Sequence, residues 1–496
     1  MNKIKMGWSE VDMTPKKGTK ISLAGQFFER ITDEVESPIT VTAFALESGD
    51  DQMVIVSCDL VAIGANVMDA VRENLKGKID LPLDKIIINA IHTHTSMAYE
   101  RKTKIPISNG ALRVLAEMVP PEMAYQPLVS SEDCLSPKEC LNIVVNAISQ
   151  AVIKAWTERD YGYYQNAFGR AAVGMNRRVC YDDGSAKMWG DTNKANFTCL
   201  EAGNDSGIEL IYTFDKDKKF TGVIANIACP SQVVEHRSYI SSDYWGKVKE
   251  NLRAKYGDHI NVLGLCSAAG DQCPRDMIRW VNPETPIDDP NIKRDSYIER
   301  RADPSMFDVS GLKVVGRRIS NELISVFEEL GDDFKDEGLL VHETFNIVLP
   351  LRRVTIAEYN DAIDKIDRFV EKNKGRKINF EDNAAMHIYA GTIARYKAQQ
   401  TLDTFEEEIH IIRFGDIAIA TNPFELFLDY GNQIRARSKA KQTILIQLAC
   451  GADGYLPTKN AENGSHYSAY VSSGYTGHVG GDILVRETVR RINNKF

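Results

Sequence analysis

Short apolar runs rich in β-branched residues alternate with amphipathic stretches over the first two-thirds of the 496-residue chain. The strand candidates are 40–48, 52–63, 85–91, 208–214, 222–228 and 260–266. Helical periodicity lies between them, at 65–76, 138–157, 243–255 and 310–330. This alternation is typical of α/β proteins, so the sequence predicts a mixed or mostly parallel sheet with flanking helices.

The last third of the chain continues the pattern with one interruption. Strand-like segments at 337–350 and 406–420 flank two polar helical stretches, 355–373 and 383–400. We therefore expect one catalytic domain over 1–496 with a helical insertion at about 352–402. A strand at 442–449, an irregular Gly/Ser/Tyr-rich stretch at 451–480 and a helix near 481–493 complete the chain. Such a long irregular stretch indicates either a loop over a binding site or plain surface.

Composition narrows the class of protein. Hydrophobic residues make up 43% and charged residues 26%, which is ordinary for a globular protein. The formal net charge of −9 gives no support to a nucleic-acid-binding surface. No apolar run is long enough to insert into a membrane, and the first residues lack the features of a signal peptide. Nine irregularly spaced cysteines indicate reduced, cytoplasmic usage. The sequence leaves the oligomeric state open.

The most specific motif is an apolar strand, 85–91, followed by His92-Thr-His94. Side chains alternate along an extended chain, so both imidazoles point to the same side just beyond the strand. Strand ends are where α/β proteins bind ligands, and imidazole is a common zinc ligand. The pair could bind one metal ion or combine a ligand with a catalytic base. The plain alternative is two loop histidines with ordinary hydrogen bonds.

Three further polar residues follow turns or strand ends. Asp271 comes after strand 260–266 and a small-residue turn, where it is either a site carboxylate or a cap for backbone N–H groups. Glu425, in Asn422-Pro-Phe-Glu425, could bind a metal or favour a helix N-terminus. Arg177 could bind an oxyanion with its planar guanidinium, or belong to a solvated basic pair with Arg178.

Taken together and in order, these stretches resemble the catalytic domain of the neutral/alkaline (non-lysosomal) ceramidase family. The resemblance covers most of the chain apart from 280–305 and 355–400. It is carried by Gly7-Trp-Ser-Glu-Val-Asp12-Met-Thr14-Pro15, Leu23-Ala-Gly25, Asn89-Ala-Ile-His-Thr-His94, Asn176-Arg177, Ala268-Ala-Gly-Asp271 with Pro274, Asn422-Pro-Phe-Glu425 and Gly454-Tyr455-Leu-Pro-Thr458. We expect no counterpart of that family's C-terminal immunoglobulin-like domain in this sequence.

The resemblance implies a neutral-ceramidase-like fold and a zinc amidase that cleaves an N-acyl bond. On this basis His92 and Glu425 are expected to bind zinc, with Tyr455 matching the family's tyrosine ligand. His94 lies beside the metal, and Arg177 matches an arginine that contacts the reacting group. The sequence departs from the family where a second zinc histidine should follow strand 222–228. Cys229 stands in that region, and either its thiolate or His236 could replace the histidine, or the metal is absent.

The first functional hypothesis is hydrolysis of an amide in a soluble small molecule by metal-activated water. His94 or Asp271 would be the general base, and Arg177 would stabilise the oxyanion. The alternative is a metal-independent hydrolase or lyase acting on a carbohydrate, with acid and base drawn from His94, Asp243, Asp271 and Glu425. The third is a ligand-binding protein without catalysis.

Overall fold

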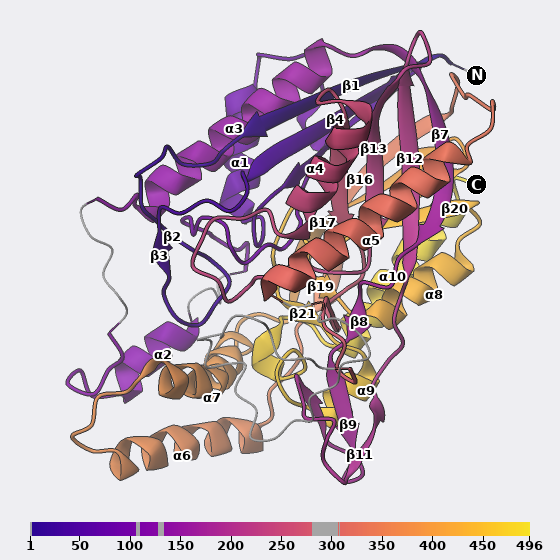
Figure 1. The fold of residues 1–496 in the computed structure, drawn as a ribbon. Coiled ribbons are helices and arrows are strands. Elements are labelled where there is room, and N and C mark those ends of the chain that lie inside the picture. The colour runs from indigo at the N-terminus through magenta and orange to yellow at the C-terminus, as the bar shows by residue number, and fades with distance from the viewer. Residues whose placement is uncertain (1, 106–109, 127–132, 280–305, 307) are drawn as a thin grey trace.

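The computed structural model describes residues 2–105, 110–126, 133–279, 306 and 308–496, so the segment 280–305, which the family resemblance did not cover, lies outside the described residues. Its largest element is an eight-stranded sheet (Figure 1). In spatial order the strands are β14 (Asn261–Cys266), β13 (Phe220–Ile227), β12 (Gly207–Asp215), β7 (Asp160–Arg170), β1 (Ile4–Asp12), β4 (Thr40–Ser48), β5 (Asp51–Cys58) and β6 (Ile86–Ala90).

This sheet is mixed, and within it only the two edge ladders are parallel. Each parallel pair is joined by a helix, α1 (Ala65–Leu75) between β5 and β6 and α4 (Tyr244–Tyr256) between β13 and β14. The inner ladders are antiparallel, and two of them, β4–β5 and β12–β13, are hairpins closed by short turns. The sequence prediction of a mixed sheet with flanking helices is confirmed, and the option of a mostly parallel sheet is wrong.

A second, four-stranded sheet packs against the first. Its strands, in spatial order, are β16 (Leu340–Pro350), β17 (Thr404–Phe414), β18 (Ile417–Thr421) and β20 (Gln442–Ile446). Helix α8 (Leu428–Arg437) joins the parallel pair β18 and β20, and α10 (His478–Asn493) packs beside it. The Asn226 side-chain amide of β13 donates to the Leu445 carbonyl of β20 at 2.7 Å, so the two sheets are in direct contact.

Helices cover the outer faces. Helix α3 (Pro137–Thr157) packs with α1 on β1, β4 and β5, and α5 (Asp308–Glu328) packs with α4 beside β7 and β14. A lobe at the bottom of Figure 1 combines α6 (Ile356–Lys372), α7 (Phe380–Ala398) and α2 (Gly110–Met118) around its own buried cluster. Among the described residues, none of these helices combines the length and apolar character that a membrane-spanning segment needs.

Short elements build the loops at one end of the sheets, while the turn η1 (Leu83–Lys85) lies at the opposite end, just before β6. The elements at the loop end are β2 (Ile21–Ser22), β3 (Ile31–Thr32), β8 (Met175–Asn176), β9 (Arg178–Tyr181), β10 (Ala186–Met188), β11 (Phe197–Leu200), β15 (Gln272–Cys273), β19 (Glu425–Leu426), β21 (Tyr455–Leu456), α9 (Lys459–Gly464) and the turn η3 (Val471–Ser473). The large sheet coils so that β14 contacts β5, where the Ser57 hydroxyl donates to the Gly264 carbonyl at 2.6 Å. As a result, the loops that follow β6, β13, β18 and β20 lie next to one another at this end of the sheets.

Candidate active site

His92 leaves strand β6 in a left-handed backbone conformation, with φ of +71°, which turns its ring away from the strand direction. Its Nδ1 lies 2.6 Å from the Val61 carbonyl, an atom that only accepts hydrogen bonds, so Nδ1 carries the hydrogen. Burial lowers the pKa of His92 and favours the neutral ring. The neutral ring therefore presents the lone pair of Nε2 to the pocket.

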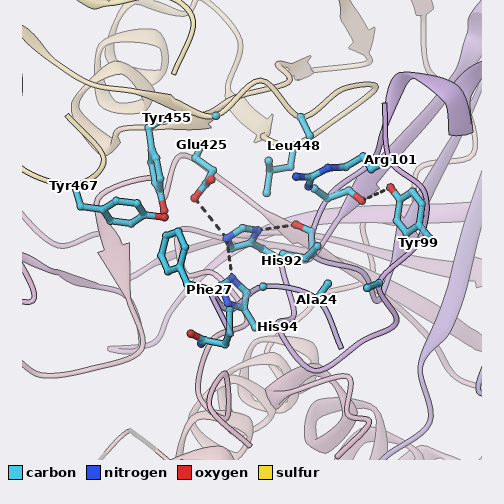
Figure 2. Close-up of a pocket in the computed structure, with 17 residues that line it drawn as sticks. Ala24, Phe27, His92, His94, Tyr99, Arg101, Glu425, Leu448, Tyr455 and Tyr467 are labelled. Carbon is cyan, nitrogen blue, oxygen red and sulfur yellow. Dashed lines mark hydrogen bonds and ion pairs between the residues drawn. The ribbon is translucent and has the colours of Figure 1, made fainter. Parts of the chain in front are cut away.

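Glu425 reaches the same place from the second sheet. The Asn422 side chain accepts from the Phe424 N–H at 3.1 Å and fixes the turn after β18. Strand β19 then pairs with β21, which sets Glu425 beside Tyr455. The Glu425 Oε2 lies 3.5 Å from His92 Nε2 (Figure 2).

His94 lies on the other side of His92, with 3.3 Å between the two Nε2 atoms (Figure 2). The Gln232 Nε2 lies 2.9 Å from His94 Nε2, while the Gln232 Oε1 accepts from Arg177 at 3.0 Å. Because that contact fixes the amide orientation, Gln232 donates to His94 Nε2, and the ring hydrogen is on Nδ1. Nδ1 lies 3.5 Å from the Glu235 carboxylate. Burial and then the neighbouring His92 hold the pKa of His94 well below its usual range.

Two tyrosines and a buried arginine form the wall next to Glu425. Arg177 donates to the Gly270 carbonyl at 3.0 Å and to the Tyr455 hydroxyl at 3.4 Å. Burial, followed by the Glu425 charge, raises the pKa of Tyr455 well above its usual value. The rings of Tyr455 and Tyr467 are 5.5 Å apart, and Figure 2 shows both phenolic ends directed into the space beside Glu425.

These residues line two adjoining cavities. The larger, of about 510 Å³, contains His92, Glu425 and Arg101, and Phe27 and Leu448 contribute apolar wall. The smaller, of about 300 Å³, contains a different set of residues, namely Arg177, Met188, Trp189, Gln232, Glu235, Arg275 and His466. Six residues line both cavities, Gly25, Gln26, Phe27, His94, Tyr455 and Tyr467. His94 therefore stands at the boundary between them.

Five of the residues singled out in the sequence thus come together: His92, His94, Arg177, Glu425 and Tyr455. Four do not line either cavity. The Asp271 carboxylate accepts from the Leu428 N–H at 2.9 Å and from Asn176 at 3.0 Å, so it caps the start of α8. Asp243 likewise caps α4, where it accepts from the Tyr244 N–H at 2.7 Å. The Cys229 thiol is buried in an apolar cluster, which raises its pKa well above the usual value, and His236 pairs with Asp308 at 3.1 Å. These placements agree with structural roles for all four.

Burial raises the pKa of Asp271 to about 6. A carboxyl whose pKa is higher in the folded protein stabilises it fully below the unfolded pKa of roughly 3.9 and loses that contribution as pH rises through about 6. We expect Asp271→Asn to gain about 3 kcal/mol relative to the unchanged protein between pH 4 and pH 7. Urea unfolding across this range measures the difference, and a pH-independent difference would contradict the assignment.

Several residues of the smaller cavity were not predicted from the sequence. Gln232 and Glu235 follow strand β13, in the region where the family resemblance placed a histidine ligand. Their position just after a strand end is the sequence feature that could have identified them as site residues. Arg275 and Trp189 carried no such signal, because they come to the cavity through β15 and the loop after β10.

The arrangement around His92 is suited to a divalent metal ion. The lone pair of His92 Nε2 and the Glu425 carboxylate approach each other with no hydrogen between them, and a cation placed there would relieve this repulsion. Two ligands at 2.0–2.1 Å from a tetrahedral zinc are about 3.3 Å apart, close to the 3.5 Å between His92 and Glu425. Tyr455 adds a phenolic oxygen at the same wall. Cys229 and His236 would not contribute.

A second cluster, Glu408, His410 and Cys450, has its ligand atoms within 4.8 Å of one another. Arg72 binds both Glu408 oxygens there, at 3.0 and 2.6 Å. A guanidinium already neutralises this carboxylate, so we do not assign a metal to the cluster.

Two solved structures resemble this fold. The neutral ceramidase from Pseudomonas aeruginosa gives a TM-score of 0.67 at 15% sequence identity and covers 100% of this chain and 75% of that chain. A structure described as ceramidase complexed with C2 gives a TM-score of 0.66 at 13% identity, with the same coverage. Neither family models nor curated proteins match the chain. The chain therefore has a mixed α/β fold like that of the neutral ceramidase structures.

Proposed function

We propose that this protein is a metal-dependent hydrolase that cleaves an N-acyl amide bond in a soluble substrate. The observation that supports it most is the lone pair of His92 Nε2 directed at Glu425 inside the larger cavity. His92 and Glu425 would hold the ion, with Tyr455 as a further oxygen ligand. A divalent ion such as zinc lowers the pKa of bound water from roughly 15.7 to about 7 and so supplies a nucleophile at neutral pH.

His94 is the general base in this proposal. Its pKa, held well below the usual range by burial, keeps the ring neutral at neutral pH. The Glu235 carboxylate faces the protonated Nδ1 and would stabilise the imidazolium that forms when Nε2 takes up a proton in place of its hydrogen bond from Gln232. A base in this position contributes about 10²- to 10⁴-fold to the rate.

Arg177 would stabilise the negative charge that develops on the amide oxygen. It is buried and already held by hydrogen bonds to the Gly270 carbonyl and the Tyr455 hydroxyl, so it needs little rearrangement when charge develops. Water then supplies the oxygen of the released acid, and the nitrogen leaves as an amine with the proton carried by His94.

The first test is the metal content of the purified protein combined with an amidase assay. We expect about one zinc ion per chain, with hydrolysis of N-acyl amino acids and N-acyl ethanolamines that a chelator abolishes and added zinc restores. A metal-free protein that cleaves glycosides at the same rate with and without chelator would overturn the proposal. That outcome would instead support the metal-independent carbohydrate enzyme.

A further inference from the structure

Two cysteines face each other in the small sheet formed by β10, β9 and β11 (Figure 1). Cys180 of β9 and Cys199 of β11 are opposite one another in the antiparallel register. Opposite residues of an antiparallel pair point to the same face with Cα atoms about 4.5–5.5 Å apart, a separation that a disulfide can span. Both thiols are free, and Cys180 is half-buried while Cys199 is exposed. The pair is therefore placed for a disulfide and is accessible to a small oxidant.

The two thiols differ in how readily an oxidant attacks them. Their side chains are in hydrogen-bond contact. Burial, followed by the Glu201 charge and the Cys199 side chain, raises the pKa of the Cys180 thiol to about 12, so Cys180 keeps its hydrogen at neutral pH. Because exposure and thiolate character decide which thiol is oxidised, Cys199 reacts first and Cys180 second.

The same face of the small sheet carries a buried ion pair. Arg178 comes two residues before Cys180, and Glu201 comes two residues after Cys199, so alternation along the strands directs all four side chains to one side. The Arg178 guanidinium donates to both Glu201 oxygens, at 2.6 and 3.0 Å. The Glu201 N–H also donates to the Arg178 carbonyl at 2.9 Å. The cysteine pair and the ion pair are thus neighbours on one face.

Arg178 also holds the segment 461–468, which carries Tyr467. It donates at 2.8 to 3.3 Å to four acceptors there, the carbonyls of Ala461, Ser465 and Tyr467 and the Ser468 hydroxyl. This segment needs such support because Ser465, His466 and Ser468 all have a positive φ, a strained conformation for L-residues. Tyr467 lines both cavities of the candidate site. The Arg178–Glu201 ion pair therefore fixes part of the pocket wall.

We propose that Cys180 and Cys199 form a redox-active pair whose disulfide fastens β11 to β9 and so stabilises the neighbouring ion pair. The oxidant is a peroxide. The Cys199 sulfur bonds to one peroxide oxygen, the O–O bond breaks and water leaves, which converts Cys199 to a sulfenic acid. The Cys180 sulfur then bonds to the Cys199 sulfur, and the sulfenic oxygen leaves as a second water with the Cys180 hydrogen. The two thiols lose two electrons, which reduce the peroxide to water. This site goes beyond the proposed hydrolysis and does not depend on it.

Peptide mapping after treatment of the full chain with hydrogen peroxide tests the disulfide. Trypsin cleaves at Lys187 and Lys194, so the two cysteines lie in separate peptides unless a disulfide joins them. We expect the joined peptides and a loss of two thiols per chain, reversed by dithiothreitol and absent from Cys199→Ser. Cys134→Ser is the matched control, because Cys134 is also a partly exposed free thiol, and it should still form the link. A peroxide-treated chain without the Cys180–Cys199 link, whether unmodified, over-oxidised at Cys199 or joined to a second chain, would overturn the proposal.

Hydrogen exchange tests the effect on the ion pair. The amides of 461–468 should exchange more slowly by about tenfold or more in the oxidised protein, because opening this segment requires the contacts of Arg178 to break. Peroxide-treated Cys199→Ser should exchange there as the reduced protein does. Unchanged exchange at 461–468 in a protein whose disulfide is fully formed would overturn the proposed stabilisation.

Discussion

Replacing His92 with asparagine is expected to lower kcat/KM for an N-acyl substrate by about a thousandfold and to remove the bound metal. The variant loses the Nε2 lone pair that faces Glu425. Asparagine is the better replacement than alanine because position 92 has φ of +71°, a left-handed conformation that asparagine adopts more readily. Elemental analysis and steady-state kinetics measure the two effects.

His466→Asn is the matched control for this variant. His466 also has a positive φ, of +75°, and is largely buried, but it lines only the smaller of the two cavities. We expect it to retain the metal, so that loss of metal from His92→Asn cannot be attributed to replacing any buried histidine. Full activity and an unchanged metal content in His92→Asn would refute the role given to this residue.

The second large effect is expected from Gly25→Ala. A Cβ at Gly25 would lie 2.4 Å from Cγ of His94, and the residue has φ of +100°. Because the His94 ring is held by Gln232 and Glu235, it must leave these partners to admit the methyl group. Displacing a catalytic group by about 1 Å costs on the order of 100-fold in rate, so we expect kcat/KM to fall by about that factor.

Gly18→Ala separates the steric effect from backbone strain. Gly18 also has a positive φ, of +83°, but a Cβ there meets no atom within 4 Å. Both variants should lose about 1–2 kcal/mol of stability, seen as a lower Tm, because an L-residue is strained in this conformation. Only Gly25→Ala should lose activity. Equal activity losses in the two variants would show that the contact with His94 is not the cause.

Sequence reasoning located most strands of the fold because their apolar β-branched runs are local signals. Strand β6 and its two histidines are the clearest case. Strand β7 (Asp160–Arg170) was not predicted, because it contains no β-branched residue. Strand β1 (Ile4–Asp12) was not predicted either, and its residues entered only through the family resemblance. Of the two predicted alternatives, the mixed sheet is confirmed and the mostly parallel sheet is wrong, because helical crossovers occur only at the two edges of the large sheet.

Part of the site was also predictable, because some of its residues are positioned by local sequence signals. His92 and Glu425 follow strand ends and are turned inward by their own local backbone. Whether Asp271 faces the cavity depends instead on the start of helix α8, whose Leu428 N–H binds its carboxylate. The contact between Gln232 and His94 depends on how strands β6 and β13 meet across the coiled sheet. Such partners are distant in sequence, and no local pattern identifies them.

The helical lobe has a consequence for how this scaffold can change during evolution. Helices α6 and α7 lie between β16 and β17. The chain leaves the sheet at Pro350 and returns at Thr404, and these two residues face each other in the ladder. The ends of the insertion are therefore neighbours, so its length can change without shifting the register of the sheet. Helix α7 also contacts the turn η3, just after the loop that carries Tyr467. Descendants of one ancestor can thus change the helices that pack against η3 while the strands bearing His92 and Glu425 stay the same.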